Sequence, residues 1–209
     1  MPLFQFSLVA FTSIFVLVDP VAAVPTFLAM TGDANRASRR HMAARAAWTC
    51  LIVLLTFSIA GTLIFRLFGI TLAAFKIAGG LILGLIGLDM LRAKRSPTKE
   101  TPGETEEGTE KDDVGIIPLG IPMLAGPGSI SSVMVLMSQN ADWPHAIVVV
   151  CSIAAASAVS FIVLAAADRV SSFLHETGIR ILTRMMGLLL TAIAVQFVLN
   201  GLKDAGFVR

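Results

Sequence analysis

The sequence predicts an all-α membrane protein, and three observations carry this prediction. Hydrophobic residues make up 56% of the chain and charged residues only 14%, against about 25% charged residues in ordinary soluble domains. The mean hydropathy is +0.82. The apolar residues also gather into six runs, each long enough to cross a bilayer as a helix. These runs cover residues 4–31, 43–68, 70–91, 114–139, 145–167 and 179–202.

The basic residues predict the orientation of the six helices. Twelve of the 16 lie in the loops after the first, third and fifth runs, and the face richest in lysine and arginine is normally cytoplasmic. Both termini then face away from the cytoplasm. A rival topology makes the first and fourth runs re-entrant hairpins, but it places Arg169, Arg180 and Arg184 opposite the other basic loops. Because the basic residues mark the ends of apolar runs, they do not indicate a nucleic-acid partner.

A polar stretch divides the chain into two units, residues 1–92 and 114–209. Residues 93–113 contain no large apolar residue and carry a net charge of −3, so nothing in them can bury a core. We interpret this stretch as a disordered cytoplasmic linker between two three-helix units. An alternative function, a membrane scaffold whose acidic linker docks a cytoplasmic partner, stays open.

The two units resemble each other. Residues 19–31 align with residues 126–138, and residues 75–79 align with residues 183–187. The similar offsets, 107 and 108 residues, predict an internal duplication. Three crossings per unit is an odd number, so the two units must be inverted relative to each other in the membrane. Inverted repeats whose corresponding helices are interrupted indicate the central site of a secondary transporter.

The first apolar run is interrupted near its middle by an acid and two prolines. Proline removes a backbone donor and clashes with the preceding turn, so we expect the helix to break around Asp19, Pro20 and Pro25. Backbone groups freed inside a bilayer need partners from protein or from a watered cavity. A carboxylate at that depth costs about 2.5–3.5 kcal/mol on insertion scales. We therefore expect Asp19 to line a polar site at mid-membrane, where it is the candidate for coupling to H⁺ or Na⁺.

The fourth run is interrupted at a corresponding place by Gly126, Pro127 and Gly128. Proline suits the first position of a restarting helix, and glycine lets a ligand approach the backbone closely. The amides of Gly128, Ser129 and Ile130 would form a positive helix end that suits a carboxylate. Glycine and proline also occur as packing kinks in membrane helices, but two interruptions in corresponding places, one with an acid, favour a site. The substrate-binding candidates are Asp19, Pro20, Pro25, Gly126, Pro127, Gly128, Ser129, Ser131 and Ser132.

Three motifs resemble the MarC family of bacterial and archaeal inner-membrane proteins. They are LVDP through PTFL at residues 17–28, PLGIPMLAGPGSIS at residues 118–131 and MGLLLTAIAVQ at residues 186–196. The resemblance covers nearly all of the chain outside the linker. It implies a six-span integral membrane protein that is placed with the neutral amino acid transporters.

These observations together predict an inner-membrane secondary transporter of small neutral amino acids, such as glycine and alanine, or of similar solutes. A channel or an exporter of another small solute is the alternative within the same class. An enzyme is not expected, because Asp19 and Asp89 are predicted at different depths and no Ser–His pairing is present. Cys50 and Cys151 lack metal-ligand spacing, so no metal or cofactor is expected. The expected partners are the solute, the lipid bilayer and a coupling ion, and a homo-oligomer stays open.

Overall fold

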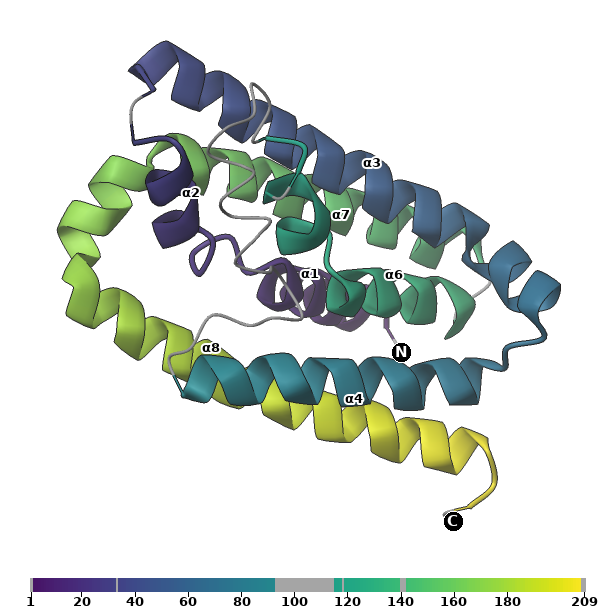
Figure 1. The fold of residues 1–209 in the computed structure, drawn as a ribbon. Coiled ribbons are helices and arrows are strands. Elements are labelled where there is room, and N and C mark those ends of the chain that lie inside the picture. Colours follow the sequence, from purple (N-terminus) through teal and green to yellow (C-terminus); the bar gives the residue numbers. More distant parts are fainter. Residues whose placement is uncertain (1, 33, 93–114, 118, 140–141, 208–209) are drawn as a thin grey trace.

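The computed structural model describes residues 2–32, 34–92, 115–117, 119–139 and 142–207. Every regular element within these residues is helical (Figure 1). The linker predicted at residues 93–113 lies outside the described residues. In chain order the elements are α1 (Leu3–Val18), α2 (Val24–Met30), α3 (Arg36–Phe68), α4 (Leu72–Leu91), η1 (Leu119–Leu124), α6 (Pro127–Gln139), α7 (Trp143–Ala165) and α8 (Ala167–Asp204).

Four helices are long and apolar enough to cross a membrane, and they correspond to the second, third, fifth and sixth apolar runs. Their spanning parts are Arg36–Gly61 of α3, all of α4 and α7, and Arg180–Asp204 of α8. The first and fourth runs form shorter helices because each is divided, α1 being followed by α2 and η1 by α6. The prediction of an all-helical membrane protein is therefore confirmed.

Two of the long helices begin well before the apolar runs that predicted them. α3 begins at Arg36, where the side chain of Asn35 caps the helix by accepting a hydrogen bond from the amide of Ser38 at 2.9 Å. α8 begins at Ala167 and continues through a kink at His175, whose φ of 52° is left-handed. The sequence predicted starts at residues 43 and 179 instead, because hydropathy marks only the part of a helix that suits lipid.

α4 lies side by side with the C-terminal part of α8 and runs antiparallel to it (Figure 1). Glycines make this close contact possible. A Cβ on Gly80 would lie 2.7 Å from the carbonyl oxygen of Ala194, and a Cβ on Gly87 would lie 2.9 Å from the amide nitrogen of Thr191. Small residues that let two backbones approach are a usual basis of helix packing in lipid.

Lys76 places a buried cation at one end of this helix pair. Its side chain is 5% exposed, and its ammonium lies 2.5 Å from the carboxylate of Asp204, which is 43% exposed. A buried charge is tolerated when it is paired. The ion pair therefore links α4 to the last turn of α8.

α1 runs through the middle of the molecule (Figure 1). Ala10, Ile14 and Val18, which follow one another at helical spacing, are fully buried. α1 contacts both α6 and α7, while α6 also contacts α3 and α4. The end of α1 and the start of α6, where the two predicted interruptions lie, are thus enclosed by other helices.

Candidate functional site

The chain leaves the helical conformation at Asp19, directly after α1. Asp19 has a left-handed backbone with φ of 48°, and its amide donates to the carbonyl oxygen of Phe15 at 2.9 Å. Aspartate tolerates this conformation because its short side chain can bond locally. Here the amide of Ala22 donates to Oδ1 of Asp19 at 3.3 Å. The residue is only 2% exposed, so its carboxylate is buried at the break and closes the turn that leads to α2.

The two prolines of the first interruption have different surroundings. Pro20 is buried next to Asp19, whereas Pro25 stands in the first turn of α2 and is exposed. A proline at this position loses no helical hydrogen bond, because the first amides of a helix have no intrahelical partner. Pro25 therefore starts α2 without joining the buried residues around Asp19.

The second interruption begins earlier than predicted. Ile121 has extended backbone angles, φ −133° and ψ 126°, and the peptide bond that follows it is cis. The helix restarts at Pro127, where the sequence placed it. A Cβ on Gly126 would lie 2.8 Å from the carbonyl oxygen of Pro122. At this position the glycine allows the chain to fold closely against itself.

The serines after the restart are buried, and two of them bond back to the preceding turn. Ser129 Oγ donates to the carbonyl oxygen of Gly126 at 3.0 Å, and Ser131 Oγ donates to that of Pro127 at 2.7 Å. Ser132 is 1% exposed. A hydroxyl that donates to the backbone still keeps its oxygen lone pairs as acceptors. These serines are therefore held in place with acceptor capacity remaining.

One of the three amides expected to bind an anion is used within the helix. The amide of Ile130 donates to the carbonyl oxygen of Gly126 at 3.0 Å, so the prediction of a free amide at Ile130 is wrong. The amides of Gly128 and Ser129 precede that first intrahelical bond. They are the backbone donors that the start of α6 directs at the interruption.

The two interruptions meet around Gly128. A Cβ on this residue would lie 2.3 Å from Cδ2 of Leu83 on α4 and 3.7 Å from Cδ2 of Leu17 on α1. Leu17 stands two residues before Asp19, so the end of α1 and the restart of α6 are neighbours. The sequence pattern predicts a ligand that lies close to the backbone at this glycine. In this conformation Leu83 occupies that space.

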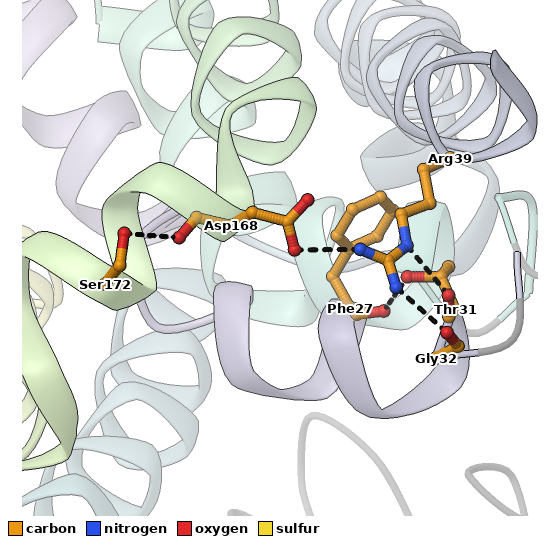
Figure 2. Close-up of polar contacts among 6 residues, drawn as sticks. All are labelled: Phe27, Thr31, Gly32, Arg39, Asp168 and Ser172. Atoms are coloured by element: carbon orange, nitrogen blue, oxygen red, sulfur yellow. Dashed lines mark hydrogen bonds and ion pairs between the residues drawn. The ribbon is translucent and has the colours of Figure 1, made fainter. Parts of the chain in front are cut away.

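Sequence reasoning missed a network around Arg39, which Figure 2 shows. Its guanidinium donates to the carbonyl oxygens of Thr31 at 2.8 Å and Gly32 at 3.0 Å, and it forms an ion pair with Asp168 at 2.8 Å. The carbonyls at the end of a helix carry negative partial charge, which a cation stabilises. Arg39 thus joins the end of α2 to the first turn of α8. Its presence in a basic loop was the only sequence signal, and that signal was interpreted as topology.

Comparison with known proteins places this fold in a family. A family model described as MarC family integral membrane protein matches residues 4–205. A UPF0056 membrane protein of Methanocaldococcus jannaschii is 41% identical over 201 residues, which cover 96% of this chain and 98% of the relative. The UPF0056 membrane protein YvbG of Bacillus subtilis is 36% identical over 202 residues, which cover 96% of each chain.

The similarity extends to more distant bacteria. The UPF0056 membrane protein YhcE of Escherichia coli is 32% identical over 193 residues, which cover 92% of this chain and 90% of the relative. No solved structure matches the chain. The family match spans both interruptions and all four helices of spanning length. The chain therefore belongs to the MarC family of integral membrane proteins.

Proposed function

We propose that this protein is a secondary transporter of small neutral amino acids, such as glycine and alanine, or of similarly small solutes. One observation carries the proposal: two helix interruptions meet in the interior, where the buried Asp19 lies near the restart of α6 at Gly128. Helix ends enclosed at mid-membrane are the places where secondary transporters hold substrates and coupling ions. Glycine and proline also form packing kinks in membrane helices, but a buried carboxylate at one of the two breaks favours a site.

The pattern of helix contacts supports an inverted repeat with six crossings. In such a repeat α1 with α2 corresponds to η1 with α6, α3 corresponds to α7, and α4 corresponds to α8. Each of these parts packs against its own counterpart, α1 on α6, α3 on α7 and α4 on α8. Two of the remaining contacts also exchange under this correspondence, since α1 on α7 matches η1 on α3, and α8 on α2 matches α4 on α6. A two-fold axis in the membrane plane accounts for this pattern.

The charge distribution supports cytoplasmic placement of the basic loops. Arg39 and Asp168, which follow the first and fifth apolar runs, form an ion pair at 2.8 Å, so these two loops share one face. The rival topology with re-entrant hairpins places them on opposite faces. With the basic face inside, both termini are periplasmic, in an inner membrane.

The two helix ends have opposite polarity, which suits a zwitterion. The C-terminal end of α1 carries negative partial charge, and Asp19 adds a carboxylate there; the N-terminal end of α6 carries positive partial charge. We assign the substrate carboxylate to the amides of Gly128 and Ser129, and its amine or the coupling H⁺ or Na⁺ to Asp19. Ser131 and Ser132 are the second contacts.

Transport then requires that the side chain of Leu83, which covers Gly128, moves away. Leu83 fills the space beside Gly128, so a carboxylate reaches that amide only after this side chain is displaced, by a change of rotamer or by movement of α4 away from α6. α4 is tightly paired with α8 through glycines. We therefore assign alternating access to movement of the α4–α8 pair against α1 and α6.

The test is uptake of labelled glycine and alanine into liposomes that contain the purified protein, with and without a Na⁺ or proton gradient. Asp19→Asn is the decisive variant, because asparagine keeps the Oδ1 acceptor for the amide of Ala22 and tolerates the left-handed backbone. It removes the charge and replaces one acceptor oxygen by an amide NH2 group, at nearly the same volume. Loss of one charge-assisted hydrogen bond should weaken substrate or ion binding by about 10- to 100-fold.

Asp89→Asn, in α4 and outside the interruptions, is the matched control and should transport like the parent. Saturable uptake that a gradient enhances, and that only Asp19→Asn reduces, supports the proposal. Uptake that does not saturate with concentration would identify a channel instead. Equal uptake by both variants would remove Asp19 from the mechanism.

A further inference from the structure

A cavity of about 440 Å³ lies where the end of α2, the start of α3, the end of α7 and the start of α8 meet. Its polar wall carries four arginines and one acid, namely Arg36, Arg39, Arg40, Arg169 and Asp168. Among the described lining residues, three positive charges are therefore in excess. A cluster of this kind attracts anions, and arginine in particular binds phosphate through paired N–H groups.

The excess charge belongs to the arginines other than Arg39. Arg39 is held by Asp168 and by two backbone carbonyls (Figure 2), so it shapes the wall of the cavity. Arg40 lies with its guanidinium carbon 5.9 Å from the ring centroid of Phe161, a contact that orients the side chain without cancelling its charge. Arg36 and Arg169 are exposed at the rim. These three guanidinium groups can reach a ligand.

The rest of the cavity lining is apolar. It is formed by Phe27, Phe161, Ile162 and Leu164, and Ile162 is 61% exposed on the outer surface of α7. Phe161, Ile162 and Leu164 lie at the end of the spanning part of α7. A cavity lined by both arginines and apolar side chains suits a ligand that is itself charged at one end and apolar at the other.

A second cavity, of about 310 Å³, continues this apolar wall toward the middle of the bilayer. It lies between α3 and α7, shares Phe161 with the first cavity, and has one polar lining residue among those described, Ser157. Ala44, Ala47 and Leu51 line it from α3, so the groove follows one face of that helix. From Arg40 to Leu51 the helix rises about 16 Å, close to half of the ~30 Å hydrocarbon thickness.

We propose that the two cavities together bind one anionic phospholipid from the leaflet at this face. Its phosphate lies against Arg36, Arg40 and Arg169, and one acyl chain lies in the groove between α3 and α7. Charge complementarity and the matching depth of the groove favour this ligand over a free phosphate, which would leave the apolar groove unused. Basic pockets between membrane helices are established sites for lipid head groups. The proposal is independent of the transported solute.

The test is native mass spectrometry of the full chain in detergent, titrated with phosphatidylglycerol or with phosphatidylcholine of the same acyl chains. The double variant Arg36→Gln/Arg40→Gln removes two charges from the pocket and leaves the structural Arg39 in place. Arg92→Gln, an exposed arginine at the end of α4, is its control. Ala158→Phe fills the groove, and Ala155→Phe, exposed on α7 but outside the cavity, is the control for that change.

We expect the parent to prefer phosphatidylglycerol and the double variant to bind it about 10- to 30-fold more weakly, because each arginine near anionic lipid contributes about fivefold. Arg92→Gln and Ala155→Phe should bind like the parent, while Ala158→Phe should bind more weakly. An unchanged preference in the double variant would overturn the proposal. Displacement of the lipid by inorganic phosphate, together with normal binding by Ala158→Phe, would also overturn it and identify a free-phosphate site.

Discussion

Replacement of Gly87 by alanine should weaken the contact between α4 and α8. A Cβ at this position would lie 2.5 Å from Oγ1 of Thr191, 2.9 Å from its amide nitrogen and 3.0 Å from the carbonyl oxygen of Gly187. Two of these three atoms are backbone, and the hydroxyl is fixed by a 2.8 Å hydrogen bond to the same carbonyl. No side-chain rotation can therefore make room, and the two helices must separate.

Gly84, one turn away on α4, provides the matched control. A Cβ there would lie 3.7 Å from Cβ of Ala194, an ordinary van der Waals distance. Both substitutions gain the same helix propensity, up to about 1 kcal/mol, so the difference between the variants isolates the overpacking. Forcing backbones apart in a packed core costs about 1–3 kcal/mol. Gly87→Ala should be less stable than Gly84→Ala by that amount.

The measurement is thermal denaturation of the purified variants in one detergent, followed by loss of the folded peak in size-exclusion chromatography. For a chain of this size, about 1 kcal/mol corresponds to ~2–4 °C, so the melting temperatures should differ by about 2–12 °C. Equal melting temperatures for the two variants would refute the reasoning. They would mean that α4 and α8 are not in backbone contact at Gly87.

Two further predictions concern the ion pair and the topology. Asp204→Asn should lower the stability of the protein by about 1–3 kcal/mol, because it leaves the buried ammonium of Lys76 without its carboxylate. Lys76→Met should cost less, and denaturation of the two variants in detergent compares them. A larger loss of stability in Lys76→Met than in Asp204→Asn would contradict the buried ion pair. Ser172→Cys and Thr71→Cys should react with a membrane-impermeant maleimide from opposite faces of sealed vesicles, as six crossings require. The parent chain, whose two native cysteines lie within α3 and α7, is the control, and labelling of both new cysteines from one face would exclude this topology.

The membrane class and the approximate positions of the two interruptions could be predicted because each has a local cause in the sequence. Six apolar runs give helices, and a proline beside an acid or between glycines interrupts them. The structure accordingly ends α1 at Val18 and starts α6 at Pro127. Features of this kind depend on residues that are neighbours along the chain.

The surroundings of the interruptions could not be predicted, because they depend on residues far apart in the sequence. Leu83 covers Gly128 only because α4 packs across α6. Packing decides such details, and hydropathy carries no information about packing partners. The early break at Ile121 is different, because it has a local cause: Pro122 follows it, and the residue before a proline is disfavoured in the helical conformation. The sequence motifs predicted this interruption only at Gly126, Pro127 and Gly128.

The charged residues predicted a topology, and one contact in the structure fits it. The ion pair between Arg39 and Asp168 brings together the loops after the first and fifth apolar runs, while the orientation of the termini stays a prediction. The same residues form a cavity with an apolar wall, which a count of charges per loop cannot reveal. Lys76 is a further example, because its place in an apolar run gives no sign of the distant partner, Asp204, that makes its burial tolerable.

In the proposed duplication, the proposed site is asymmetric although the two units resemble each other in sequence. Asp19 and Gly126 are aligned in the two units, and each lies at an interruption. Asp19 supplies a carboxylate and Gly126 supplies none. The carboxylate adds to the negative partial charge at the C-terminal end of α1, while the amides at the start of α6 have no acid at the aligned position that would compete for them. A symmetric pair of acids would bind two cations and repel a carboxylate. In the proposed site, the exchange of one acid for glycine at aligned positions would therefore produce a dipolar arrangement, which is what a zwitterion bound in a single orientation requires.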